Sequence, residues 1–126
     1  MILTRNELQQ LCNNHLVELV FNRRGKPNPK PIRRMLCTND RRLLSSALGR
    51  TTFHYTTPTG SLPYDAIKYG LVVAFDILKQ DWRMIPANGV NFITAVPTFP
   101  QEKFWEYFDK KIRNMTKQQK YNFINK

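Results

Sequence analysis

Short stretches in which hydrophobic and polar residues alternate run through most of the first hundred positions of the chain. In Leu16–Phe21 every second residue, beginning with Val17, would point to one face of a strand, and the same alternation resumes in Ile32–Cys37. Between them, Gly25–Pro31 carries prolines at alternate positions, which excludes a helix and favours an extended loop. These three segments together predict a β-hairpin with a long, proline-stiffened connection.

Further strand-like stretches follow this hairpin. Arg50–Thr57 is rich in threonine and aromatic residues, Gly70–Ile77 is the strongest strand signal, and Trp82–Ile85 and Val90–Val96 follow after turns. Five or so short strands with few helical residues in the middle predict a mainly β (α+β) fold built on a small five-stranded barrel of the SH3-like or Sm-like type. An OB-fold remains the alternative.

Helix signals flank this β-rich region. Thr4 and Glu7 form a capping box, which predicts a short helix over about Arg5–Cys12. Within the β-rich region, Thr38 or Asn39 is expected to cap a short helix that ends at Gly49.

A longer helix is predicted after Thr98-Phe99-Pro100, because proline is accepted in the first turn of a helix. Its apolar residues recur at helical spacing and should pack on the barrel: Phe104, Phe108, Ile112 and Met115. A basic, aromatic tail, Lys117–Lys126, follows. The chain is therefore expected to consist of a helix and barrel over residues 1–97 and a docked C-terminal extension over 98–126.

Positive charge is concentrated in one segment. The chain has a net charge of +11, and nine basic residues with a single acid, Asp40, lie between Arg23 and Arg50. These nine are the predicted nucleic-acid contacts: Arg23, Arg24, Lys26, Lys30, Arg33, Arg34, Arg41, Arg42 and Arg50. Most are arginines, which bind phosphate in a bidentate manner and stack on bases. DNA or RNA is the expected partner, an acidic protein surface is the second possibility, and solubility alone the third.

Aromatic residues near this segment could serve as stacking platforms for nucleic acid. Tyr64 and Tyr69 follow the basic segment and are candidates for such contacts, whereas Phe53 is expected to belong to the core.

Catalytic and metal-binding patterns are weak. The serines lack a nucleophile-elbow context, and no phosphate-binding loop or His-Glu-x-x-His motif is present. Cys12, Cys37, His15 and His54 could in principle bind zinc, but their spacing matches no zinc pattern, so two reduced thiols are expected. We therefore expect a non-enzymatic protein without a cofactor or metal.

Two parts of the chain resemble a small phage-encoded family that is classed as an Sm-like, SH3-type β-barrel related to the WYL domain. Val72–Ile77 with Trp82–Ile85 looks like the closing hairpin of that family, and Val17–Phe21 with Arg33–Thr38 is similar to its opening hairpin. The resemblance covers about residues 15 to 95. It implies a barrel in a small protein of a T4-type phage, and related WYL domains bind nucleic acids or nucleotide ligands and regulate transcription.

The expected setting is the cytoplasm of an infected bacterium. The N-terminus lacks the long apolar run of a signal peptide, and the longest apolar run is too short to span a membrane. The expected role is DNA or RNA binding that acts on transcription or the nucleoid. The alternative is a host-takeover adaptor or inhibitor that binds an acidic surface of a host protein, such as RNA polymerase or a defence protein.

Overall fold

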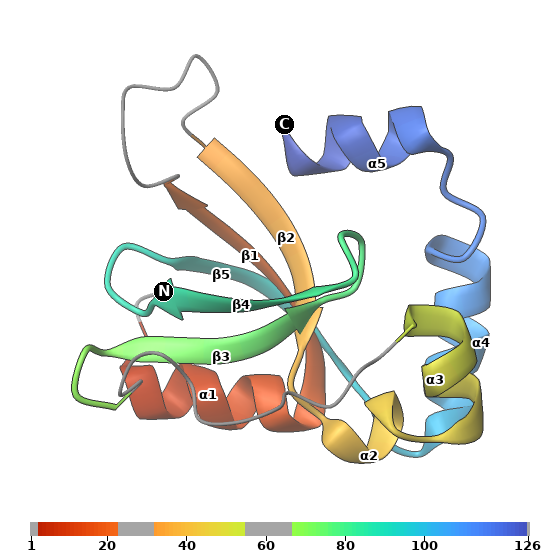
Figure 1. The fold of residues 1–126 in the computed structure, drawn as a ribbon, viewed down its shortest axis with the longest axis horizontal. Coiled ribbons are helices and arrows are strands. Elements are labelled where there is room, and N and C mark those ends of the chain that lie inside the picture. The colour runs from red at the N-terminus through yellow and green to blue at the C-terminus, as the bar shows by residue number, and fades with distance from the viewer. Residues whose placement is uncertain (1–2, 23–31, 55–66, 126) are drawn as a thin grey trace.

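A computed structural model describes residues 3–22, 32–54 and 67–125, which form helices and strands of one α+β fold (Figure 1). The helices are α1 (Arg5–Asn14), α2 (Arg41–Leu44), α3 (Ala47–Phe53), α4 (Gln101–Lys111) and α5 (Lys117–Ile124). The strands are β1 (His15–Asn22), β2 (Ile32–Thr38), β3 (Leu71–Asp76), β4 (Asp81–Pro86) and β5 (Asn91–Pro97). None of the helices in these ranges combines the length and the apolar character needed to cross a membrane.

The five strands form one antiparallel sheet in the order β4-β3-β2-β1-β5, which confirms the expected five-stranded α+β fold. β1 pairs with β2 from Val17 opposite Cys37 to Asn22 opposite Ile32, so residues 23–31 connect two adjacent strands. In the part of the chain that the structure describes, β4 and β5 are the two edges of the sheet and do not pair with each other. The sheet is therefore not a closed barrel, although its strands bend, as Figure 1 shows for β2.

β2 and β3 pair over a short stretch, and side chains of α1 form hydrogen bonds with β3 beyond it. Only Cys37 and Thr38 of β2 pair with β3. Beyond that point the side-chain amide of Gln9 bonds to both the N–H and the C=O of Val73, at 2.9 and 3.0 Å. Arg5 Nε donates to the carbonyl of Leu71 at 2.8 Å. Side chains of α1 thus satisfy backbone groups of β3 where the neighbouring strand has moved away.

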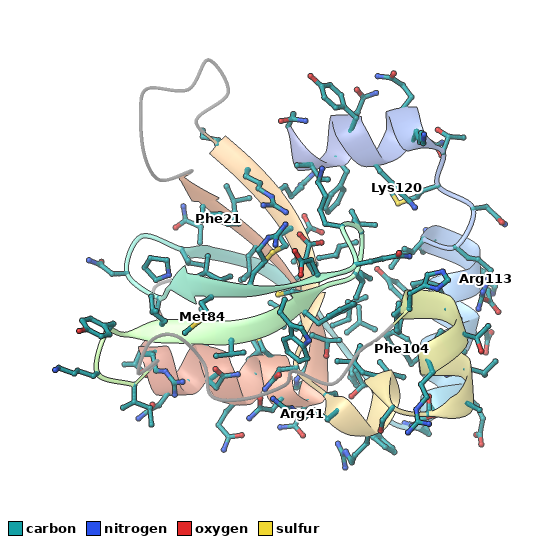
Figure 2. All side chains as sticks on the ribbon, in the orientation of Figure 1. Phe21, Arg41, Met84, Phe104, Arg113 and Lys120 are labelled. Carbon is teal, nitrogen blue, oxygen red and sulfur yellow. The ribbon has the colours of Figure 1, made fainter. Side chains whose placement is uncertain are left out.

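Two apolar clusters lie on the two faces of the sheet, as the alternation along β1 and β2 predicts. One face meets α1 and contains Val17, Leu19, Met35 and Cys37. The other carries Leu16 and Leu36 and is covered by α2, α3 and α4, which gather at one side of the molecule (Figures 1 and 2). The predicted helical stripe is part of this second cluster: Phe104, Phe108 and Ile112 are buried and Met115 is half-buried.

The predicted strand at Arg50–Thr57 is wrong over the residues that can be compared. Residues up to Phe53 belong to α3, His54 ends that helix with a φ of 49°, and residues 55–57 lie outside the described ranges. Ser46 caps α3 by accepting the amide of Gly49, and Phe53 is buried in the second cluster. Burial of Phe53 on a helix outweighs the weak β preference of the surrounding threonines.

The predicted cap of the preceding helix is also wrong. Asp40, rather than Thr38 or Asn39, caps α2, because its carboxylate accepts the amides of both Arg42 and Leu43. Gly49 does not end this helix but lies inside α3. At the C-terminal end, the predicted tail contains a further helix, α5, which begins at a capping box formed by Thr116 and Gln119.

Gly49 is required by the close approach of α2 and α3. A Cβ at this position would lie 2.0 Å from the carbonyl oxygen of Leu43 and 2.8 Å from that of Leu44. We expect Gly49→Ala to lower the free energy of unfolding by about 1–3 kcal/mol, because backbone must move to make room. Urea denaturation measures this, and Ala47→Gly in the same helix is the control, with a loss of at most about 1 kcal/mol. A Gly49→Ala variant as stable as the parent would contradict the close approach.

Candidate nucleic-acid interface

The two hairpin arginines within the described ranges lie on opposite faces of β2 and both have carboxylate partners. Arg33 forms an ion pair and hydrogen bond with Asp76, whose side chain is 1% exposed. Arg34 Nε lies 2.8 Å from Glu18 Oε2, and its guanidinium stacks 4.9 Å from the ring centroid of Phe123. Adjacent residues of a strand point to opposite sides, so these two charges cannot act on the same surface.

Asp76 is held from several directions at the β3–β4 turn. The amides of Leu78 and Lys79 both donate to its Oδ1 at 3.1 Å. Burial raises the pKa of Asp76, and these amide bonds and the charges of Arg33 and Arg83 oppose that rise. Arg33 therefore has a structural role as the main counter-charge of a buried carboxylate, which the charge count along the sequence does not reveal.

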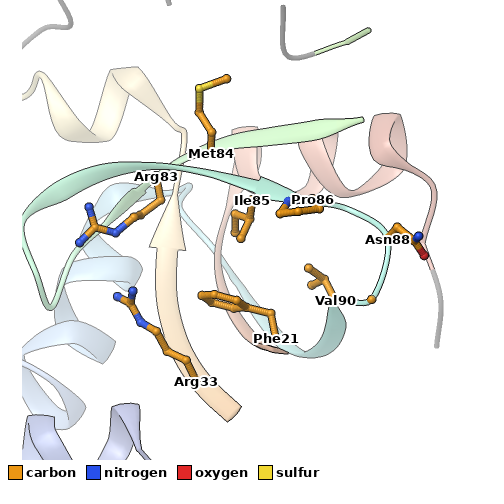
Figure 3. A pocket seen from close by; sticks show the side chains of 9 residues that line it. Phe21, Arg33, Arg83, Met84, Ile85, Pro86, Asn88 and Val90 are labelled. Carbon is orange, nitrogen blue, oxygen red and sulfur yellow. The ribbon is translucent and has the colours of Figure 1, made fainter. Parts of the chain in front are cut away.

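A cavity of about 240 Å³ lies beside Arg33, at the strand ends that residues 23–31 connect. We call it the arginine pocket. Figure 3 shows the guanidinium groups of Arg33 on β2 and Arg83 on β4 facing each other on one side of it. The remaining wall is largely apolar and includes Phe21, Ile85, Pro86 and Val90.

Both guanidinium groups of the pocket are held in place. Arg83 Nη1 donates to Asp81 at 2.7 Å and to the carbonyl of Trp82 at 3.2 Å. The guanidinium carbon of Arg33 lies 5.7 Å from the ring centroid of Phe21. A pocket with fixed guanidinium donors on one side and an aromatic ring in the wall can bind the polar edge or an oxyanion of a planar ligand.

Arg83 and Phe21 were not among the predicted contacts. Phe21 could have been found from the predicted hairpin, because it lies directly opposite Arg33 in the pairing of β1 and β2. Arg83 forms an ion pair with Asp81 at the β3–β4 turn.

The remaining predicted arginines that are described lie on α2 and α3. Arg41 and Arg50 are exposed, and the guanidinium of Arg41 lies 5.4 Å from the ring centroid of Trp82. Arg42 stacks 4.1 Å from the ring centroid of Phe99, and its Nε lies 3.2 Å from Asp40 Oδ1. Arg41 and Arg42 thus contact other partners than Arg33 and Arg34 do, so the described arginines do not share one site.

Asp40 joins the start of α2 to the segment before α4. Thr98 donates its hydroxyl proton to Asp40, and Arg42 and the amide of Leu43 donate as well. Burial opposes ionisation of Asp40, but these hydrogen bonds and the charge of Arg42 outweigh it, and the pKa of this carboxyl is lowered. The first amides of α2 are thus already bound, which leaves them unable to bind a phosphate.

Of the other predicted contacts, only Tyr69 lies within the described residues. Tyr69 is 60% exposed, and the ammonium of Lys68 lies 5.6 Å from its ring centroid. Tyr64 and the basic residues Arg23, Arg24, Lys26 and Lys30 lie outside the described residues.

Cys12 and Cys37 are free, buried and close together. A hydrogen bond with Cys12 and burial raise the pKa of the Cys37 thiol well above its usual value. This disfavours the thiolate that zinc binding requires. No cluster of three or more potential metal ligands occurs among the described residues, and the expected absence of a metal stays a prediction.

Comparisons with known proteins give no further guide. No family model matches this chain, and searches of curated proteins and of solved structures return no match. The resemblance to the phage family therefore stays a prediction, and the candidate interface depends on the geometry described above.

Proposed function

We propose that this chain is a non-enzymatic, basic nucleic-acid-binding protein of a phage that acts on transcription or the nucleoid of the infected cell. The observation that carries the proposal is the arginine pocket. The pocket brings together two fixed guanidinium groups and Phe21, and the connection between the strands of Phe21 and Arg33 carries Arg23, Arg24, Lys26 and Lys30 in the sequence. Guanidinium and aromatic groups beside a dense positive charge are typical of sites that bind nucleic-acid phosphates and bases.

The curved five-stranded sheet supports the proposal that the fold is a distorted SH3- or Sm-like barrel. The opening hairpin, β1–β2, and the closing hairpin, β3–β4, are the two elements on which the resemblance to the phage family depends. In this proposal α1 takes the place of the missing strand contacts at β3.

A host protein with an acidic surface is the second candidate partner. Leu48 is 55% exposed on α3, two positions before Arg50, and Phe99 is 45% exposed under Arg42. Exposed apolar side chains beside cations are suited to a protein interface, where they supply the anchors that phosphate contacts do not need.

The salt dependence of binding tests the proposed function. If about four phosphates are contacted, the logarithm of the association constant should fall with the logarithm of salt concentration with a slope of about −3 to −4. Replacing Arg23, Arg24, Lys26 and Lys30 together by alanine should bring this slope close to zero, as measured by fluorescence anisotropy with a labelled oligonucleotide. Arg33 must be kept, because its ion pair with the buried Asp76 stabilises the fold, and Arg34 is kept because Glu18 already pairs with it.

The control for this experiment removes the same charge elsewhere. Lys103, Lys110, Lys111 and Lys117, replaced together by glutamine, should retain most of the slope, since they lie on α4 and α5. The proposal fails if the parent protein binds neither DNA nor RNA at low salt. It also fails if the control variant loses as much binding as the hairpin variant. Binding to a protein partner that persists in moderate salt would favour the second candidate.

A further inference from the structure

A second cleft lies on the helical side of the molecule, away from the arginine pocket. It has a volume of about 250 Å³ and is bounded by α3, the turn between β3 and β4, and the region where α4 gives way to α5. The polar side chains that line it are Thr51, Thr52, Gln80, Arg113 and Lys120. Figure 2 labels Arg113 and Lys120 on the side of the molecule where α3, α4 and α5 lie. We call this site the helix cleft.

The charged side chains that line the helix cleft are both positive. Arg113 and Lys120 contribute a guanidinium and an ammonium, and no carboxylate is among the described residues that line it. Lys120 is half-buried, and within the described ranges no acidic side chain lies within ion-pair distance of it. An anion in the cleft would therefore meet a positive side chain that no carboxylate of the described ranges neutralises.

Arg113 is held ready for such an anion. Its Nε donates to Asp109 at 2.5 Å, and its guanidinium carbon lies 5.3 Å from the ring centroid of Phe108 and 5.9 Å from that of Trp105. The bond to Asp109 uses Nε, so the two Nη groups remain to donate to a ligand. A guanidinium fixed in this way loses little conformational entropy on binding.

The neutral donors of the cleft come from α3 and the β3–β4 turn. The Thr51 hydroxyl already donates to the carbonyl of Ala47 at 3.0 Å, so the side chains of Thr52 and Gln80 are the neutral donors for a ligand. Gln80 has a φ of 55°, a left-handed conformation that is uncommon for residues other than glycine and asparagine. A left-handed residue is regular at the end of a β-hairpin turn, so the turn between β3 and β4 fixes the position of Gln80 beside the cleft.

We propose that the helix cleft binds a phosphate group. Lys120, Arg113, Thr52 and Gln80 would donate from different elements, and the oxygens of a tetrahedral phosphate accept hydrogen bonds from several directions at once. A carboxylate, which is planar and has two oxygens, suits such a set of donors less well. The phosphate belongs either to a nucleic-acid backbone or to a small phosphorylated molecule. The site does not depend on the proposed function, because none of its residues lines the arginine pocket.

Titration with inorganic phosphate, followed by NMR at constant ionic strength with chloride as the balancing anion, tests the site. We expect saturable shifts of the Thr52, Gln80 and Arg113 amide signals. Lys120→Met keeps most of the alkyl chain but removes the charge, and should weaken phosphate binding by about 10- to 100-fold. Lys120→Arg should restore binding, and Lys117→Met on the same helix should leave it unchanged. The absence of saturable shifts, or equal phosphate affinity of Lys120→Met and the parent protein, would overturn the proposal.

An oligonucleotide arm identifies the source of the phosphate. If the cleft binds the nucleic-acid backbone, Lys120→Met should also weaken oligonucleotide binding and reduce the salt slope by about 0.7–0.9. If oligonucleotide binding is unchanged while inorganic phosphate binding is lost, the ligand is a small phosphorylated molecule. If the parent protein binds phosphate in the cleft but binds no oligonucleotide, the proposed function is refuted and the phosphate site in the helix cleft is not.

Discussion

Arg33→Ala should lower the free energy of unfolding by roughly 3–5 kcal/mol, although the sequence marks Arg33 as a ligand contact. The substitution leaves Asp76 buried, with a side chain 1% exposed, and without its ion-pair partner. Urea denaturation at neutral pH measures the loss. Burial already raises the pKa of Asp76, and removing Arg33 should raise it further. The loss should therefore shrink as the pH falls through this pKa, because protonation removes the uncompensated charge.

Two further variants separate the buried charge from general damage to the fold. Arg34→Ala removes the neighbouring arginine, whose partner Glu18 is more exposed, at 15%, and should cost about 1 kcal/mol or less. Combining Arg33→Met with Asp76→Leu removes both charges and should recover part of the stability, since a buried pair can be replaced by apolar residues. A neutral-pH stability of Arg33→Ala equal to that of Arg34→Ala would show that the ion pair with Asp76 is unimportant.

Phe108→Ala should cost about 3–5 kcal/mol, because the side chain is 4% exposed in the second apolar cluster. Its ring centroid lies 5.3 Å from that of Phe53 on α3 and 5.4 Å from that of Trp105 on α4 itself, so the substitution removes one aromatic contact between α3 and α4 and one within α4. Thermal melting measures the effect. A melting temperature close to that of the parent protein would mean that α4 does not pack on the sheet.

Leu48→Ala is the matched control for this experiment. Leu48 is on α3 as Phe53 is, but it is 55% exposed, and its loss should change stability by at most about 0.5 kcal/mol. If the surface around Leu48 is a protein interface, Leu48→Ala should weaken the binding of an acidic protein partner.

The parts of the fold that the sequence predicts well are those in which one local pattern decides the structure. The alternation in β1 and β2 assigns Leu19 and Met35 to one face of the sheet and Leu36 to the other. The capping box at Thr4 gives the start of α1. The segment from Arg50 to Phe53 shows the limit, because its threonines favour a strand and only the burial of Phe53 against α4 makes it helical.

The candidate interface is harder to predict, because charge along a sequence does not show which charges are already compensated. Arg33 and Asp76 are 43 positions apart, and their pairing depends on the contact between β2 and β3. Arg113 and Lys120 share a cleft with Thr52 and Gln80, although nothing in their spacing brings the four together. Their proximity follows from the packing of α3, α4 and α5 beside the β3–β4 turn.

The hydrogen bonds between α1 and β3 have a consequence for how this molecule meets other copies of itself. An open row of backbone N–H and C=O groups on a strand invites pairing with a strand of another chain. At Val73 and Leu71 that row is occupied by the side chains of Gln9 and Arg5. Any residue except proline can donate a backbone hydrogen bond to a neighbouring strand, whereas these contacts depend on two particular side chains. The first helix therefore closes this open stretch of β3 to pairing with another strand, in addition to covering the core of the sheet.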